Sequence, residues 1–253
     1  MNSFLHTEKC GNPTIDFYLA VAKPHFVTQT IASLVKVCVC CFVFFSTTAA
    51  CAQDSAAIAE EAYTKSITER STKIIQTLDI SDSIQYQKVL SILVQQYRNI
   101  NQAQQVQKNA ANAIKQQNVE AAETANQIKQ TEVLKASHLE QYHQAFIAQA
   151  TPLLTEKQME LLKDGITYRI FPITYAAYLD MIPTLQDAQK SKIFEWLKEA
   201  RELAMDGESS EKKHAVFGKF KGRINNYLSS EGYDLKKETS DWQLRIKARN
   251  ATK

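Results

Sequence analysis

The segment "YQKVLSILVQQYRNI", Tyr86–Ile100, decides the fold class of this chain. Its apolar residues recur at steps of three and four, which is the spacing of one face of an α-helix. A second segment, Leu139–Leu153, repeats this spacing. Alternating β-branched runs are absent, and few glycines or prolines are available for hairpin turns. The sequence therefore predicts an all-α fold, a helical bundle.

The segment between these two stripes, Asn101–Gln130, is rich in Gln, Asn and Ala. Nothing between residues 81 and 151 breaks a helix, so one continuous helix would be about 100 Å long at 1.5 Å per residue. A long helical hairpin that turns within Asn109–Asn118 is more compact, and we expect it. Because its apolar stripe is thin, we expect residues 98–135 to form a protruding arm that buries little surface.

The first 52 residues have the layout of a secretory signal peptide. A basic residue precedes the short apolar run Val37–Phe45, and small residues follow it up to the tripeptide "ACA". The run is too short to span a bilayer, which needs about 20 apolar residues. We expect residues 1–52 to be removed, leaving residues 53–253 as a single periplasmic or secreted all-α domain without a transmembrane helix. Lipidation at Cys51 is the alternative to simple export, and Thr48 disfavours it.

The distribution of cysteines and charges restricts the partners of the exported chain. All five cysteines lie within residues 1–52, so we expect neither disulfides nor a cysteine zinc site. Residues 207–253 carry 11 Lys/Arg and 6 Asp/Glu, whereas residues 53–206 carry 16 and 19. Export disfavours nucleic acid as the partner of this basic quarter. An acidic saccharide, a lipid head group or an acidic protein fits it better.

Several helix boundaries carry local signals. Thr155 with Gln158, and Thr184 with Asp187, have the spacing of capping boxes, in which two side chains satisfy free backbone N–H groups. Gly207 is expected to end a helix in the left-handed conformation, and one of the serines at 209 and 210 to cap the next helix.

An aromatic segment follows the first capping box. Five of its residues fall on one stripe at helical steps: Tyr168, Phe171, Tyr175, Tyr178 and Ile182. An aromatic stripe of this kind is more often core than binding site, and a sugar-stacking platform is the alternative interpretation. Asp164 and Asp180 flank the stripe as candidate general acids or bases, and Asp164 equally suits a role as partner of a helix end.

No metal site or cofactor is expected. His138 and His143 are five residues apart, which places them about 140° apart on a helix, whereas metal pairs on one helical face need a spacing of three or four. We expect both to be exposed on the arm.

The segment Ser209–Asp234 predicts a C-terminal basic helix. Its basic residues flank a single apolar stripe. Most of them are explained as residues at the solvated edge of the helix, where the side-chain stem covers apolar surface and the charged group stays in water. Gly218 and Gly222 lie together on the remaining face, and each costs about 1 kcal/mol relative to Ala in a helix interior. Two such glycines suggest that a backbone or a ligand approaches closely there. An anion held by Lys219, Arg223 and Asn226 would account for both features.

Four segments, "SSEKKH", "FGKFKGRINNYL", "GYDLKKE" and "DGITYRIFPITYAAYLDMIP", resemble an uncharacterised exported α-helical family of Bacteroidetes-type bacteria. The resemblance runs from about Ala62 to the C-terminus. This family is a domain of unknown function whose genes are often found near polysaccharide-utilisation genes, which implies a periplasmic or surface role around glycans. Ala215 and Val216 stand where the resemblance leads us to expect aromatic residues, so any stacking there would be weaker or different.

Together these features predict an exported glycan-associated binding or accessory protein with a basic and aromatic site for an acidic saccharide or other anion. The expected site residues are Lys212, His214, Lys219, Arg223, Asn226, Tyr168 and Tyr175. One alternative is an enzyme that cleaves acidic polysaccharide by β-elimination, with Lys219 and Arg223 neutralising the carboxylate and His214 or a tyrosine as base. Another is a periplasmic chaperone or assembly factor that uses the arm.

Overall fold

The computed structural model describes residues 57–117 and 119–251, and the regular elements in these ranges are helices, with no β-strand. From Glu60 onward the described residues form one compact unit. The all-α fold expected from the apolar spacing is therefore confirmed. The predicted signal peptide, with all five cysteines, lies outside the described residues. None of the described helices is long and apolar enough to cross a membrane.

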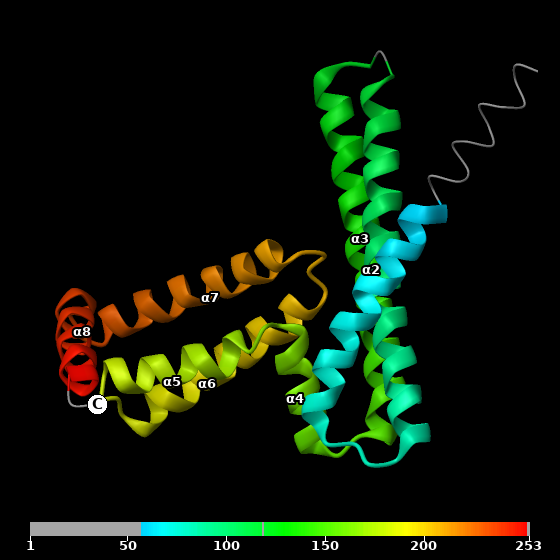
Figure 1. Ribbon diagram of the computed structural model, residues 1–253. Helices are drawn as coiled ribbons and strands as arrows, with labels where there is room; N and C mark the ends of the chain where they lie inside the picture. The colour runs from blue at the N-terminus through cyan, green and yellow to red at the C-terminus, as the bar shows by residue number, and fades with distance from the viewer. Residues whose placement is uncertain (1–56, 118, 252–253) are drawn as a thin grey trace, which may run out of the picture. The chain divides into compact units, whose positions relative to one another are not determined.

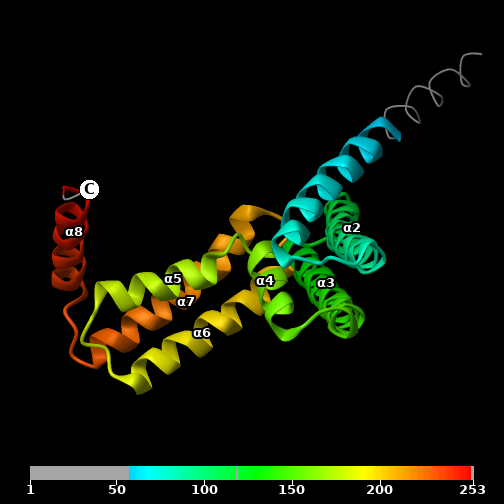
Figure 2. The ribbon, with the colours of Figure 1, turned by 60° about the horizontal axis from the view of Figure 1, so that its bottom comes forward.

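Two long antiparallel helices form the predicted hairpin (Figure 1). α2 (Ser83–Lys115) and α3 (Ala121–Ala150) lie side by side, and Figure 2 shows the same pairing from another direction. Ala103 and Ala111 of α2 are buried. Their small side chains allow a neighbouring helix to approach closely. The chain reverses between the end of α2 at Lys115 and the start of α3 at Ala121, at the C-terminal end of the predicted range Asn109–Asn118. The end of α2 is rich in alanine, which has a high helix propensity, so the helix continues through most of this range.

The first hydrophobic core lies where the hairpin meets the N-terminal helix (residues 57–75), η1 (Gln76–Leu78) and α4 (Glu156–Ile166). A short turn, η2 (Thr151–Leu153), joins α3 to α4. The two apolar stripes that predicted the hairpin supply much of this core, with Val89, Leu93, Tyr97, Phe146 and Ala150 buried. Removal of this apolar surface from water is the main force that holds the helices together.

The second core lies between α5 (Ile170–Met181), α6 (Asp187–Met205) and α7 (Ser210–Ser230). The apolar stripe of the predicted basic helix faces this core, with Phe217, Ile224 and Leu228 buried. α8 (Leu235–Ala251) packs against α5 and α7. The core interpretation of the aromatic segment holds for Phe171 and Tyr178, which are buried, and not for Tyr168, which is exposed.

Helix boundaries agree with the sequence signals in part. The Thr155–Gln158 capping box is present, as is the Ser209 cap of α7. The prediction of a Thr184–Asp187 box is wrong, because the N-cap of α6 lies two residues later, at Gln186, which forms the box with Gln189. Gly207 is not left-handed.

Gly207 has a steric role instead. A Cβ at this position would lie 2.9 Å from Lys213 Cγ, so its lack of a side chain makes room for that lysine.

Gly165 allows the N-terminal helix to approach α4. A Cβ there would lie 2.6 Å from Cγ2 of Ile74, which is buried and stiff because it is β-branched. We expect Gly165→Ala to lower the free energy of unfolding by about 1–3 kcal/mol through overpacking, despite the better helix propensity of alanine. Urea unfolding measures this. The control is Gly218→Ala, where an added Cβ meets nothing within 4 Å and should be neutral or stabilising. Equal effects at both positions would contradict the expected overpacking.

Candidate functional site

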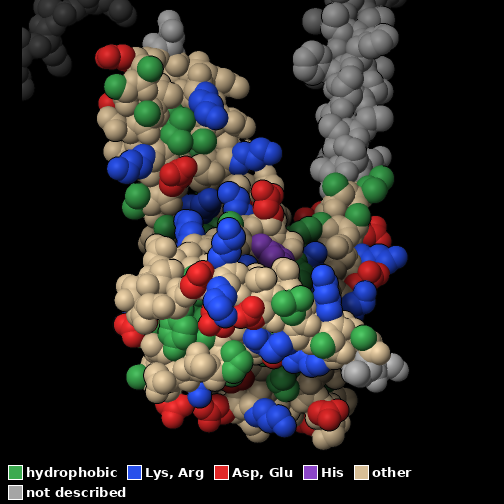
Figure 3. All heavy atoms as spheres, turned by 90° about the vertical axis from the view of Figure 1, so that its left-hand side faces the viewer, with side chains coloured by type: hydrophobic (Ala, Val, Ile, Leu, Met, Phe, Trp, Pro, Cys, Tyr) green, Lys and Arg blue, Asp and Glu red, His purple; other side chains and the backbone are tan. Residues whose placement is uncertain are grey.

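The polar residues predicted to bind an anion on α7 are all exposed: Lys212, His214, Lys219, Arg223 and Asn226. Arg223 lies over the ring of Trp196, with 4.4 Å between its Cζ and the ring centroid. Its Nη1 is 3.5 Å from a carboxylate oxygen of Glu199. On the face shown in Figure 3, basic side chains are interspersed with acidic ones. Arg223 is therefore already engaged by an aromatic ring and an acid.

The two predicted tyrosines have different environments. Tyr175 packs on core aromatics, with its ring centroid 5.3 Å from that of Phe194. Tyr168 is 40% exposed, and its ring centroid lies 6.0 Å from that of His214. Tyr168 lines the cavity described below, and the other predicted site residues do not line it. The structure therefore does not gather the predicted residues into one cavity.

The glycines of α7 face open space. A Cβ at Gly218 or Gly222 would meet no atom within 4 Å. The expectation that another backbone approaches them closely is wrong for the described part of the chain. Their cost in helix propensity has no explanation in the packing of this structure.

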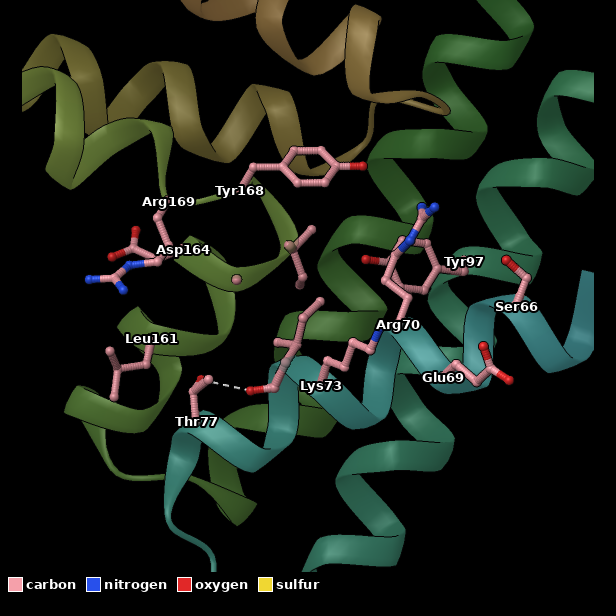
Figure 4. A pocket seen from close by; sticks show the side chains of 13 residues that line it. Ser66, Glu69, Arg70, Lys73, Thr77, Tyr97, Leu161, Asp164, Tyr168 and Arg169 are labelled. Atoms are coloured by element: carbon pink, nitrogen blue, oxygen red, sulfur yellow. Dashed lines mark hydrogen bonds between the residues drawn. The ribbon is translucent and has the colours of Figure 1, made fainter.

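A cavity of about 790 Å³ opens between the N-terminal helix, α2 and the end of α4 (Figure 4). Arg70 and Lys73 line it and lie three residues apart, so they share one helix face. Neither forms an ion pair with a described residue. Tyr97 from α2 and Tyr168 from the end of α4 also line it, and Figure 4 shows Arg70 beside Tyr97.

Two acidic side chains line this cavity together with three basic ones. Asp164 is one of the acids, and it accepts a hydrogen bond of 2.7 Å from Arg201, which also pairs with Glu160. Glu69 lies on the N-terminal helix next to Arg70. Arg169 also lines the cavity, although in Figure 4 its side chain extends away from Arg70. The cavity therefore carries excess positive charge.

Tyr97 gives the cavity a neutral hydrogen-bond donor. Burial raises the pKa of its hydroxyl to about 12, and the nearby Arg70 only partly opposes this. The Arg70 Cζ lies 5.7 Å from the centroid of the Tyr97 ring. Tyr63 donates a hydrogen bond of 3.0 Å to the backbone carbonyl of Tyr97, which ties the N-terminal helix to α2. Tyr97 is thus fixed in place and stays protonated over the physiological pH range.

The rim of the cavity at the end of α4 is strained. Tyr168 and Arg169 have φ angles of 57° and 58°, a left-handed backbone conformation that residues other than glycine rarely adopt. The Tyr168 amide donates to Gly165 at 3.3 Å and the Arg169 amide to Asp164 at 2.7 Å, which is the Schellman pattern of a helix end. Each such residue costs on the order of 1–3 kcal/mol and persists only where the surrounding structure imposes the conformation.

The back of the cavity rests on an ionic network centred on a buried arginine. Arg201 of α6 is fully buried, with its guanidinium 2.7 Å from Asp164 and 2.6 Å from Glu160. Burial raises the pKa of Asp164, and the Arg201 hydrogen bond opposes this shift. The Arg201 Cζ also lies 4.9 Å from the centroid of the Phe171 ring. The network therefore joins α4 to the second core.

Lys213 of α7 is buried next to this network. Its Nζ donates to the carbonyls of Ile166 at 3.0 Å and Met205 at 3.3 Å, the last residues of α4 and α6. It also lies 5.7 Å from the centroid of the Tyr97 ring. Burial lowers the pKa of Lys213 to about 8, and the nearby charge of Arg70 adds to this shift.

His143 was expected to be exposed on the arm, and this prediction is wrong. It forms part of a polar contact between α3 and α6. Its Nδ1 lies 3.1 Å from Asp206 and its Nε2 lies 3.8 Å from Glu202. The hydrogen bond to Asp206 raises the pKa of His143. His138 is exposed as predicted. The exposure prediction missed His143 because helical spacing does not reveal which helix packs against that face.

Asp180 binds two side chains of α8. It pairs with Arg249 and accepts a 2.7 Å hydrogen bond from Trp242. Arg249, and then Trp242, lower the pKa of Asp180 to about 2, so it has no proton to give near neutral pH. Within residues 57–117 and 119–251, no group of His, Cys, Asp or Glu side chains could hold a metal ion.

Comparison with known families adds one assignment. Residues 64–248 match the family described as protein of unknown function DUF3826. The chain belongs to this family. The match agrees with the resemblance to an uncharacterised family, since it covers the N-terminal helix from Thr64 to most of α8. No curated protein matches the chain significantly.

Sequence reasoning missed Lys213, although the sequence carries a signal for it. Lys213 falls in the middle of the apolar stripe of α7, which marks a buried charge. Tyr97 cannot be told apart in the sequence from the other residues of the apolar stripe of α2. Arg70 and Lys73 carry no motif, since one i, i+3 basic pair on a helix is common.

Proposed function

We propose that this DUF3826 protein is an exported, glycan-associated binding protein that holds the anionic group of an acidic saccharide in the cavity over Arg70 and Lys73. The observation that supports this most is a pair of exposed cations, without ion pairs to the described residues, that line a cavity of about 790 Å³. Small-molecule sites have volumes of about 300–1,000 Å³. Export and a role around glycans are parts of the proposal that rest on the sequence.

The chemistry of the lining suits a carboxylate or sulfate. The planar guanidinium of Arg70 can donate two parallel hydrogen bonds to such a group, and the Lys73 ammonium adds a point charge. Tyr97 supplies a neutral hydrogen-bond donor, and its ring lies beside the guanidinium of Arg70.

The test is binding to an array of uronate-containing, sulfated and neutral oligosaccharides, followed by calorimetric titration. We expect Arg70→Met to weaken binding of acidic oligosaccharides about 10- to 100-fold, since a hydrogen bond to a charged group contributes about 1.5–3 kcal/mol. Affinity should also fall with salt. Neutral oligosaccharides should bind weakly to both proteins.

Two further variants locate the site. Lys65→Met removes an exposed lysine of the same helix that does not line the cavity, and should leave affinity unchanged. Arg223→Met tests the location on α7 that the sequence predicted. If no acidic oligosaccharide binds, or if Arg223→Met abolishes binding while Arg70→Met does not, the proposal for this cavity is overturned.

One observation favours an enzyme acting on the same class of ligand. His214 Nδ1 lies 2.8 Å from the carbonyl of Ser210, which can only accept, so Nδ1 carries the hydrogen and Nε2 is left as a base. Its ring lies against Tyr168 at the cavity rim. If Nε2 takes the proton from the carbon next to the uronate carboxylate, the electron pair left there forms a double bond to the neighbouring carbon as its bond to the glycosidic oxygen breaks. That oxygen takes a proton from water, and the other product is an unsaturated sugar. Ultraviolet absorbance of that product, lost in His214→Gln, distinguishes cleavage from binding alone.

A further inference from the structure

Two helices of this chain end with the same hydrogen-bond pattern and different residues. At the end of α7, Gly232 has a φ of 94°, and Gly232 and Tyr233 donate to Ser229 and Leu228. At the end of α4, Tyr168 occupies the position that corresponds to Gly232. Glycine is the usual residue there because it adopts the left-handed conformation without a steric penalty.

The tyrosine ring is not required by the core. Tyr168 is 40% exposed, and its hydroxyl has no hydrogen bond to the described part of the chain. Its ring contacts the exposed imidazole of His214 and lines the cavity. A strained residue at the rim of a cavity, whose ring belongs to neither hydrophobic core, points to a role in ligand contact.

We infer that Tyr168 is a stacking platform for a second sugar ring, so that the site takes an acidic oligosaccharide and not a single acidic sugar. This inference rests on the proposed function, which places the charged sugar on Arg70 and Lys73. Aromatic faces bind the C–H surface of a sugar ring, and an exposed tyrosine presents such a face with little conformational freedom to lose. The volume of about 790 Å³ accommodates more than one sugar ring.

The binding experiment compares galacturonic acid with its linear trisaccharide. Tyr168→Gly should weaken trisaccharide binding about tenfold and leave binding of the monosaccharide unchanged. Tyr168→Phe keeps the ring and should bind the trisaccharide as the wild type does. Arg70→Met should weaken binding of both ligands, which separates the charge contact from the stacking contact.

A stability measurement accompanies each variant. Tyr168→Gly relieves the left-handed strain and should unfold at an equal or higher urea concentration than the wild type, whereas Tyr168→Ala removes the ring and keeps the strain. Weaker trisaccharide binding in a variant that is not less stable supports the inference, because misfolding cannot explain it.

Two results would overturn the stacking role and leave the proposed function standing. They are trisaccharide affinity unchanged in Tyr168→Gly, or mono- and trisaccharide affinity reduced by the same factor. If neither ligand binds the wild type and no other acidic oligosaccharide does, the proposed function itself fails, and the stacking role with it.

Discussion

Replacing Arg201 by methionine is expected to lower the free energy of unfolding by about 3–5 kcal/mol. Arg201 has no exposed surface, and its two guanidinium nitrogens lie 2.6 Å from Glu160 and 2.7 Å from Asp164. The substitution leaves the Asp164 carboxylate, whose side chain is 15% exposed, without its cation. The free energy lost by leaving this carboxylate unpaired is larger than the free energy that methionine can gain by packing against Phe171, over which Arg201 now lies.

Chemical unfolding at neutral pH measures this effect, and its pH dependence identifies the cause. Burial already raises the pKa of Asp164, and loss of Arg201 should raise it further. A folded-state pKa above the unfolded value means that protonation favours the folded state, so the deficit should shrink as the pH falls below neutral. A deficit that does not change with pH would indicate lost packing and contradict the charge argument.

Arg223→Met is the matched control for Arg201→Met. Both arginines contact an acid and lie over an aromatic ring, but the side chain of Arg223 is 52% exposed. Exposed ion pairs contribute about 0–1 kcal/mol, so this variant should unfold close to the wild type. Similar losses in the two variants would show that burial is not what makes Arg201 important.

The fold could be predicted from the sequence because it depends on local patterns. The apolar steps in Tyr86–Ile100 determined which faces of α2 are buried, and the Thr155–Gln158 box marked the start of α4. Both signals lie within a few helical turns. The error at Thr184 also has a local cause, since Gln186 can form the same box two residues later.

The cavity could not be predicted because it brings together segments that are distant in the sequence. Arg70, Tyr97 and Tyr168 come from three helix segments, and none of them belongs to a spaced motif. The sequence predicts the site on α7, where basic residues are dense, but those residues do not line this cavity. Tyr168 is among the residues that the sequence predicts for the site, and it lines the cavity, but its left-handed backbone cannot be predicted from its residue type.

Lys213 should make the stability of the protein rise between about pH 8 and pH 10. The folded-state pKa is about 8, against an ordinary value of 10.5. Between these two values the unfolded chain binds the proton and the folded chain does not, so raising the pH favours folding. The difference corresponds to about 3 kcal/mol at most. Above pH 10 the trend should reverse, because burial raises the pKa of Tyr97 and of Tyr178 to about 12.

Urea unfolding of the wild type and Lys213→Met at pH 7, 8, 9 and 10 measures this effect. The variant should lose the rise below pH 10, while other groups titrate equally in both proteins and cancel in the comparison. Lys212→Met, at the exposed neighbouring position, should retain the rise. A parallel pH dependence in the wild type and Lys213→Met would mean that the ammonium is charged throughout. The hydrogen bonds to Ile166 and Met205 would then outweigh burial, and Lys213 would act as a permanent cationic cap on α4 and α6.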